Sequence, residues 1–472
     1  MRTMYSAIRR ISLVSFILVG LLSSWGIQIA SAQTFPPPIL SPAPGSTLTS
    51  SMVTFTGDHT SQDLEHTLWV GTRLRGTDLS KQKLGMGHTA TVSGLPTTGT
   101  IFVSWWTRNN VGWFVKDYTY TMDVGGGSPR VWNCPGGDVN CLINALTIGN
   151  GSGNLEIIQL AAGTYTIASF DNGSNLLPRI IGNIKIEGVG SQSTVIRGMT
   201  DANVDFFQTF EVDALGTLEL TKLAIMKGGT GVRNRGGSVT MREVTISDNT
   251  INGLGGRGGP GIINDQGGTI TIQDSTVADY NEGVPGAGGG ISNSGTMDIT
   301  GSFIKRNRGE GMGGIANGST GIMTINTSTI ADNRAGDGDG GGIINAGQME
   351  LRNSLVQNNS ADIVAGLVNR GDITIFKSVF IGNVSGTGVS GGAIFNAGPM
   401  TISQSVIAFN KAGDDGGGIF NRDDGDLTLE QTVIFKNEAV TNGGGIKNIN
   451  GLLTLTETIV INNTPDDCVG CP

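Results

Sequence analysis

The sequence predicts an all-β protein in which a small β-sandwich precedes a parallel β-helix of about twelve coils. Three observations predict this fold. Glycine supplies 76 of the 472 residues without a Gly-X-Y period. The region after residue 130 repeats every 26 or 27 residues over most of its length. The region before it consists of short apolar runs separated by turn residues, with no helical period.

The composition sets limits on the class of protein. Hydrophobic residues make up 38% of the chain and charged residues 15%, so the chain can bury a core and is not a disordered polymer. With 14 prolines and no triplet period, it is not collagen either. The net charge is −9, which argues against a nucleic-acid surface. We expect carbohydrate or surface proteins as partners, and a monomer.

Residues 1–32 have the pattern of a secretory signal peptide. Arginines precede the apolar run Ile11–Leu22, and Ala30-Ser31-Ala32 forms a small-residue cleavage site. The apolar run is too short to span a bilayer stably. We therefore expect a secreted or cell-surface protein with no transmembrane segment in its mature chain.

Residues 33–124 predict the β-sandwich, and residues 125–130 form a glycine-rich linker. The expected strands are Met52–Thr56, Thr67–Val70, Ala90–Val92, Ile101–Thr107 and Trp113–Met122. Because neighbouring residues of a strand point to opposite faces, one of Trp105 and Trp106 belongs to the core. The other is either packed as well or able to stack on a sugar or a protein partner.

The repeat defines the second region, residues 131–472. Each unit has a glycine cluster, the pattern Ile-x-Asn, an alternating strand and then Ser/Thr-Val-Ile-x-x-Asn. The last asparagine recurs at one corner of the unit, at Asn249, Asn281, Asn307, Asn333, Asn359, Asn383, Asn410, Asn437 and Asn463.

Stacking explains the repeat physically. Coils about 4.8 Å apart place each inward Ile, Val, Leu or Met on its equivalent in the next coil. The corner asparagines then form a structural ladder of side-chain hydrogen bonds along the stack. Glycine is required where the backbone takes positive φ or where coils approach too closely for a Cβ atom.

The four cysteines predict two local disulfides, Cys134–Cys141 and Cys468–Cys471. A single zinc site would need both pairs to meet across the length of the stack, so we expect no zinc.

Asp138 to Thr147 predicts a short helix that caps the first coil. Within it, Cys141-Leu142-Ile143-Asn144-Ala145-Leu146, followed by Ile157 to Ile167, resembles the Cys-Ser-Leu-Arg-Glu-Ala start of a group of bacterial β-helix proteins. These are similar to polymorphic outer-membrane-protein repeats and belong to the pectin-lyase-like superfamily. The resemblance covers 131–472, departs from the pattern at Ile143 and Asn144, and implies a right-handed helix.

A second resemblance concerns the amino-terminal region. Pro42 to Leu48, Ser93 to Pro96 and Asp117 to Thr121 resemble an immunoglobulin-like module of bacterial surface proteins. Gly57 stands where such modules often have a tryptophan. Together the two resemblances imply a bacterial surface or secreted protein.

The superfamily includes lyases and hydrolases, so the sequence has to be searched for their chemistry. The three histidines, at 59, 66 and 88, all precede the β-helix, and Trp-Ile-Asp-His and Arg-x-Pro-x-x-Arg are absent. Gly413-Asp414-Asp415 resembles part of a hydrolase motif without its partners. We therefore predict no catalytic residues and no bound cofactor.

One loop of the repeat gathers acids. Asp337, Asp339, Asp414 and Asp415 are the candidate calcium ligands, with Glu310 and Asp362 in the same loop of other coils. The alternative is a solvated acidic edge that discourages aggregation.

Two functions follow. The first is a non-enzymatic β-helix that presents an elongated surface for adhesion or for carbohydrate or protein binding. The alternative is a polysaccharide lyase, with an Arg or Lys base and a calcium-bound acid cluster, or a related carbohydrate-active enzyme of the pectin-lyase-like superfamily.

Overall fold

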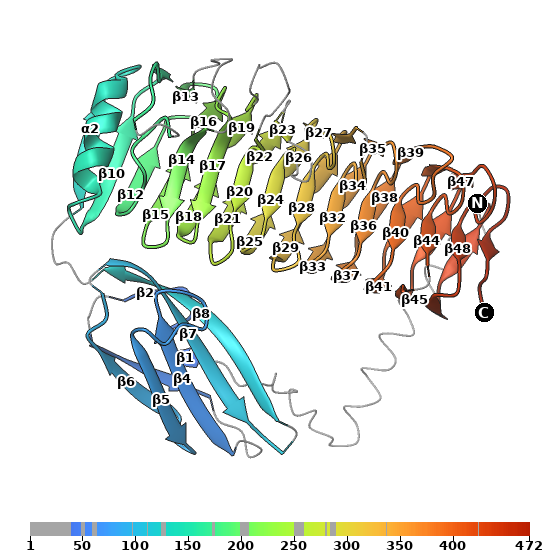
Figure 1. The fold of residues 1–472 in the computed structure, drawn as a ribbon, viewed down its shortest axis with the longest axis horizontal. Helices are drawn as coiled ribbons and strands as arrows, with labels where there is room; N and C mark the ends of the chain where they lie inside the picture. Colours follow the sequence, from blue (N-terminus) through green and yellow to red (C-terminus); the bar gives the residue numbers. More distant parts are fainter. Residues whose placement is uncertain are drawn as a thin grey trace, which may run out of the picture.

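The computed structural model describes residues 39–472 except 49–51, 59–63, 97, 111, 124–128, 172–174, 199–206, 250–258, 279–280, 284–288, 337 and 423. The expected signal peptide and most of the expected linker lie outside the described residues. Figure 1 shows a long stack of parallel strands with a small β-sandwich beside its amino-terminal half. No helix in the described part of the chain is long and apolar enough to cross a membrane.

The sandwich consists of two sheets. The smaller one has three antiparallel strands in the order β1 (Ile39–Ser41), β3 (Met52–Gly57) and β6 (Thr89–Ser93). The larger one has five strands in the order β2 (Thr47–Leu48), β8 (Trp113–Asp123), β7 (Thr98–Arg108), β4 (Glu65–Gly71) and β5 (Ser80–Gly85). All pairings are antiparallel except that of β2 with β8.

Strand β7 shows how the sandwich divides its side chains between the two faces. Ile101, Val103 and Trp105 point inward and belong to the core between the sheets, where Trp105 is fully buried. Trp106 therefore lies on the outer face of the five-stranded sheet. Strand β5 was not predicted, because Ser-Lys-Gln-Lys-Leu-Gly lacks the apolar alternation that marks a strand.

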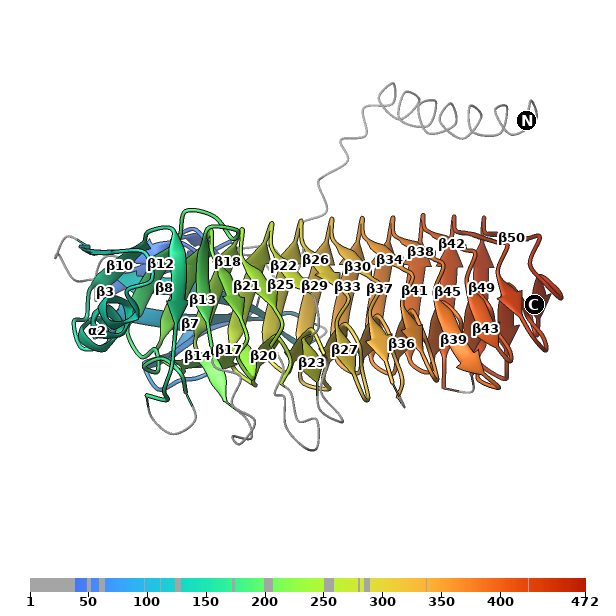
Figure 2. The same ribbon diagram turned by 90° about the horizontal axis from the view of Figure 1, so that it is seen from above.

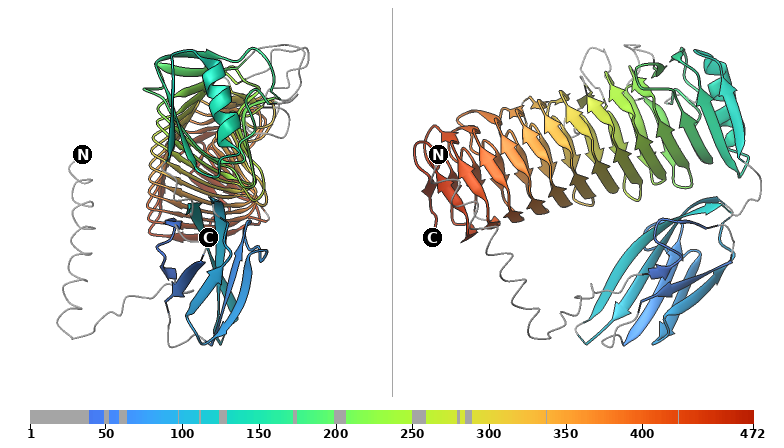
Figure 3. Two further views of the ribbon diagram at one scale, coloured as in Figure 1. Left: turned by 90° about the vertical axis from the view of Figure 1, so that its left-hand side faces the viewer. Right: turned by 180° about the vertical axis from the view of Figure 1, so that it is seen from behind.

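A helix closes the amino-terminal end of the stack, as the sequence predicts. After β9 (Arg130–Cys134), helix α2 (Val139–Gly149) begins at Asp138, whose side chain accepts a hydrogen bond from the backbone N–H of Cys141 at 3.0 Å. Its apolar face packs on the first coil, and Figure 3 shows it lying across the end of the stack. Cys134 and Cys141 form a disulfide.

Three long parallel sheets form the walls of the right-handed β-helix, and Figure 2 shows their strands in regular succession. The first has thirteen strands: β9, β10 (Leu155–Leu160), β12 (Asn183–Glu187), β15 (Thr217–Thr221), β18 (Ser238–Arg242), β21 (Thr269–Gln273), β25 (Thr296–Thr300), β29 (Ile322–Asn326), β33 (Gln348–Arg352), β37 (Asp372–Phe376), β41 (Pro399–Ser403), β45 (Asp426–Glu430) and β49 (Leu452–Thr456).

The second wall has twelve strands: β11 (Gly163–Thr166), β13 (Thr194–Arg197), β16 (Ala224–Met226), β19 (Thr245–Ser247), β22 (Thr276–Ala278), β26 (Phe303–Lys305), β30 (Thr329–Ala331), β34 (Leu355–Gln357), β38 (Val379–Ile381), β42 (Val406–Ala408), β46 (Val433–Phe435) and β50 (Ile459–Ile461).

The third wall has eleven strands, so about eleven coils carry all three walls, close to the twelve expected. They are β14 (Gln208–Asp213), β17 (Thr230–Arg235), β20 (Ile262–Asn264), β24 (Ile291–Asn293), β28 (Ile315–Asn317), β32 (Ile343–Asn345), β36 (Leu367–Asn369), β40 (Ile394–Asn396), β44 (Ile419–Asn421), β48 (Ile446–Asn448) and β51 (Cys468–Val469).

A short fourth sheet of seven strands lies between the second and third walls. It consists of β23 (Glu282–Gly283), β27 (Arg308–Gly309), β31 (Arg334–Ala335), β35 (Ser360–Ala361), β39 (Val384–Thr387), β43 (Lys411–Gly413) and β47 (Glu438–Ala439).

The strands of the three walls pair without a shift, so equivalent residues stack, whereas β39 and β43 of the fourth sheet pair with a shift between Val384 and Thr387. In the first wall Met297 pairs with Met323 and Ile299 pairs with Ile325, and all four side chains are buried. The same arrangement in every coil produces one continuous apolar column from α2 to the last coil.

Asparagine side chains form two ladders rather than one. The ladder that starts at Asn249 links each Nδ2 to the Oδ1 of the next asparagine, at 2.8 to 3.1 Å, as far as Asn463. A second ladder, at the turn between the third and first walls, runs from Asn234 to Asn448 at 2.8 to 3.0 Å. Both satisfy backbone groups inside the turns.

The glycine clusters stand where coils meet at short range. A Cβ atom on Gly314 would lie 2.4 Å from the carbonyl oxygen of Gly342 in the next coil and 3.0 Å from Nδ2 of Asn333. Neither neighbour can retreat, because one is backbone and the other belongs to the ladder. Close approach therefore explains this part of the excess glycine.

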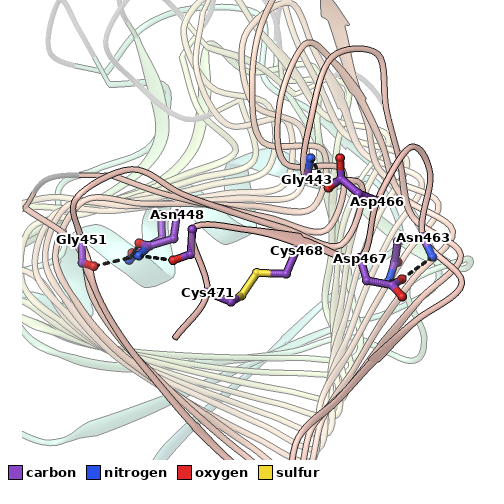
Figure 4. Close-up of a disulfide and its surroundings, with 10 residues drawn as sticks. Gly443, Asn448, Gly451, Asn463, Asp466, Asp467, Cys468 and Cys471 are labelled. Atoms are coloured by element: carbon purple, nitrogen blue, oxygen red, sulfur yellow. Dashed lines mark hydrogen bonds between the residues drawn. A yellow bond between two sulfur atoms is a disulfide. The ribbon is translucent and has the colours of Figure 1, made fainter.

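The carboxyl-terminal segment ends both ladders (Figure 4). Asp467 Oδ1 accepts hydrogen bonds from N and Nδ2 of Asn463, at 2.8 and 3.0 Å. The carbonyl oxygen of Gly470 accepts from Nδ2 of Asn448 at 3.0 Å. Between these points the Cys468–Cys471 disulfide packs on the end of the apolar column. This segment therefore caps the last coil.

Candidate functional site

Tryptophan side chains gather on the outer face of the five-stranded sheet. Neighbouring strands bring them together, because Thr67 of β4 pairs with both Trp106 of β7 and Lys83 of β5, and Trp69 pairs with Lys81. The result is a shallow pocket of about 300 Å³, which we call the tryptophan platform. Its lining residues are Thr67, Trp69, Lys81, Lys83, Trp106 and Trp113.

The three indole rings of the platform differ in exposure. Trp69 and Trp106 are half-buried and pack with their ring centroids 4.8 Å apart, whereas Trp113 is 45% exposed at the edge of the sheet. The half-buried pair packs ring against ring, and the exposed ring extends the apolar surface. Such a surface suits the C–H face of a sugar ring, because an indole presents its negative face to weakly positive groups.

Cationic groups surround the platform. The Nζ of Lys81 lies 4.6 Å from the centre of the Trp69 ring, and the guanidinium of Arg75 lies 5.9 Å from that of Trp106. The guanidinium of Arg108 lies 5.8 Å from the ring of Trp113. These are cation–π distances, so the charges lie over or beside the rings.

Neither described histidine of the sandwich lines the platform. His66 is buried, with its Nδ1 3.1 Å from Oγ1 of Thr107 inside the sandwich, and its role there is structural. His88 follows β5 without a platform contact. His59 lies outside the described residues.

A second cleft, of about 730 Å³, lies on the β-helix near its amino-terminal end. Arg179, Asp213, Arg235 and Asp265 line it. Behind it the fully buried carboxylate of Glu211 has its Oε1 2.8 Å from Nε of Arg179 and 3.0 Å from Nε of Arg235. These distances allow ion pairing although the N–H groups do not point at the oxygen.

The ion pairs constrain the chemistry of this cleft. Arg179 also lies 3.3 Å from Asp213, so both arginines that line the cleft are held by carboxylates. Each arginine therefore offers a positive charge that can hold an anionic group in the cleft.

Three of the four predicted calcium ligands are described, and Asp339 lies in a different coil from Asp414 and Asp415. Asp339 forms an ion pair with Arg370, while Asp414 and Asp415 belong to a turn three coils further along. Asp337 lies outside the described residues. Among the residues that the structure describes, no three His, Cys, Asp or Glu side chains form a metal-binding cluster.

Phenylalanine side chains of the β-helix also meet, at a place that the sequence analysis did not predict. Phe395 of β40 and Phe420 of β44 stack with ring centroids 5.6 Å apart beside a groove of about 380 Å³. Arg370 and Arg422 line the same groove. Both phenylalanines occupy the middle position of an Ile-Phe-Asn unit in consecutive repeats, and this pattern in the sequence predicts the stack.

No family model matches the sequence, and no curated protein matches it. Solved structures match through their fold. The A-module of the Azotobacter vinelandii mannuronan C-5 epimerase AlgE4 is 12% identical, with 73% of this chain and 98% of that chain covered and a TM-score of 0.46. The family 28 exopolygalacturonase of Yersinia enterocolitica is 10% identical, with 92% and 97% covered and a TM-score of 0.40.

The catalytic domain of a GH87 α-1,3-glucanase in complex with nigerose is 11% identical, with 92% of this chain and 96% of that chain covered and a TM-score of 0.42. These neighbours are carbohydrate-active enzymes with a β-helical fold. At such identities and TM-scores the likeness says nothing about the activity of this chain.

Proposed function

We propose that this protein is a secreted or cell-surface, non-enzymatic carbohydrate-binding protein of bacterial origin. The tryptophan platform is the observation that carries the proposal. It exposes apolar rings on a folded sheet, outside the core, where they are open to a ligand. The β-helix serves as an elongated support, because its apolar column runs from α2 to the last coil and the two asparagine ladders link the coils from Asn234 onward.

The test measures by affinity electrophoresis whether soluble neutral and acidic polysaccharides bind the full chain. Trp113→Ala is the decisive variant, since this ring packs at the edge and its loss leaves the core intact. Losing one stacking ring should weaken binding about 5- to 150-fold, as for stacking on nucleic-acid bases worth about 1 to 3 kcal/mol. Phe409→Ala, which removes a 49% exposed ring of the β-helix, is the matched control.

Two outcomes would contradict the proposal. One is that no polysaccharide retards the unaltered protein. The other is that Trp113→Ala binds polysaccharide as strongly as the unaltered protein and the control Phe409→Ala do. Unchanged far-ultraviolet circular dichroism of both variants would show that each is folded.

The cleft of the β-helix supports a second candidate function, a polysaccharide lyase. Its observation is the convergence of Arg179, Asp213, Arg235 and Asp265 on one cavity. A lyase cleaves by elimination and leaves an unsaturated sugar that absorbs in the ultraviolet. Incubation with uronate polymers would reveal such products, and Arg235→Ala should abolish them. A silent assay with properly folded protein would remove this candidate.

A further inference from the structure

The charges around the tryptophan platform are not balanced. Arg75 pairs with Asp117, with its Nε 3.0 Å from Oδ2, and the Nε of Arg108 lies 3.6 Å from Oε2 of Glu65. These two arginines therefore carry their own counterions. Lys83 lines the platform on the side of strand β5 and is exposed.

The two lysines of β5 differ from the arginines in their surroundings. Within the described part of the chain, Lys81 and Lys83 form no ion pair with an acidic side chain, and Lys81 stands over the ring of Trp69. They lie two residues apart, so alternation places both ammonium groups on the same face as the indoles. A protein with a net charge of −9 thus presents two lysines, unpaired with any described acidic residue, beside its aromatic surface.

We propose that the platform selects acidic glycans, whose carboxylate or sulfate groups meet Lys81 and Lys83 while a sugar ring stacks on the indoles. This inference rests on the proposed function and names its ligand class. A neutral sugar uses the rings but leaves both ammonium groups without a partner. An acidic sugar contacts both the indole rings and the ammonium groups. The lysine ammonium is a point charge on a flexible side chain, so it can adapt to anions of different geometry.

The edge position of β5 makes this selection possible. β5 pairs with only one strand of its sheet, β4, so the lysine side chains are not enclosed by a further strand. Lysine at a sheet edge also discourages edge-to-edge pairing of strands. That role explains a charge on the strand, but it does not require that both charges lie on the indole face.

The experiment compares polymers with the same backbone and different charge. Hydroxyethyl cellulose is set beside carboxymethyl cellulose, and dextran beside dextran sulfate, with the full chain as the binding protein. Two exposed ion pairs should favour the charged member about 2- to 30-fold, and the preference should fall as salt rises from about 0.05 to 0.5 M. The two pairs separate carboxylate from sulfate.

The Lys81→Gln/Lys83→Gln variant should lose the preference and keep the binding of neutral polymers. The matched control is Lys377→Gln/Lys436→Gln, because these lysines also lie near aromatic rings, 4.9 Å from Phe376 and 5.4 Å from Phe409, but on the β-helix. The control should keep the preference.

The outcomes separate the two proposals. Equal binding of charged and neutral members, or an unchanged preference in the Lys81/Lys83 variant, would overturn the selection for acidic glycans and leave carbohydrate binding in place. Failure of every polymer to bind would overturn both.

Discussion

The ladder asparagine Asn333 is the residue whose removal best tests how the β-helix is held together. Its side chain is fully buried and makes four hydrogen bonds. Its Oδ1 accepts from N and Nδ2 of Asn307, at 3.0 and 3.1 Å, and its Nδ2 donates to the carbonyl oxygen of Ile304 and to Oδ1 of Asn359, at 2.9 and 3.0 Å. Asn333→Ala would remove all four hydrogen bonds and leave their partner groups unpaired in a buried turn.

At about 1 kcal/mol for each lost hydrogen bond, the variant should lose about 4 kcal/mol of unfolding free energy. The unfolding entropy of the roughly 340-residue β-helix, at about 2.1 cal/mol/K per residue, converts this into a fall of about 6 °C in Tm. Differential scanning calorimetry measures it. Hydrogen exchange should show that the loss is centred on the neighbouring coils, because each coil of a solenoid contacts only its neighbours.

Asn326→Ala is the matched control, because it also removes one asparagine side-chain amide from the same coil. It accepts one exposed hydrogen bond from Asn353 at 3.0 Å. Surface changes of this kind alter stability by less than about 0.5 kcal/mol, so Tm should move by less than about 1 °C. Equal Tm values for the two variants would refute the argument that the ladders stabilise the coils.

Three further predictions concern the ends of the β-helix and the sandwich. Burial raises the pKa of Glu156, but hydrogen bonds from Arg130 and Trp132 outweigh it, so the pKa lies below its usual value. The stabilisation that ionised Glu156 gives the fold should be complete above about pH 5 and should be lost as the pH falls below that value. The difference in Tm between the unaltered protein and Glu156→Gln should therefore narrow below about pH 5. A Tm difference independent of pH would contradict this. Asp467→Ala should cost about 1 to 2 kcal/mol at the carboxyl-terminal cap and speed hydrogen exchange in β50, whereas Asp467→Asn keeps an acceptor and should lose less; equal exchange in both would argue against capping. Trp105→Ala should destabilise the sandwich by about 3 to 5 kcal/mol in thermal unfolding, and Trp113→Ala by far less; similar losses would mean that the two faces are assigned wrongly.

The repeat allowed most of the β-helix to be predicted. A spacing of 26 or 27 residues, an asparagine at one corner and alternating apolar residues fix how each coil closes on the last, because equivalent residues must stack. The capping helix was equally readable, since Asp138 precedes an apolar helical run. The second asparagine ladder was visible as a repeat, but its hydrogen bonds depend on a turn geometry that the spacing does not reveal.

The candidate sites were much less predictable. The platform joins Trp69, Lys81, Trp106 and Trp113, which come from four strands. Which strands neighbour each other in an antiparallel sandwich is decided by the packing of the whole domain, and β5 had no apolar pattern to mark it as a strand. The cleft at Arg179 and Arg235 likewise joins different coils.

The sequence by itself thus determined the scaffold of this protein, because a periodic pattern imposes the same local contacts on every coil and leaves few alternatives. It also determined that either Trp105 or Trp106 would face outward. Only the tertiary structure decided that Trp106 is the one, and that Lys81 and Lys83 lie beside it. The physical reason is that a stacked repeat is built from contacts between equivalent positions of adjacent repeats, whereas a surface site is built from strands that meet only when the whole sheet forms.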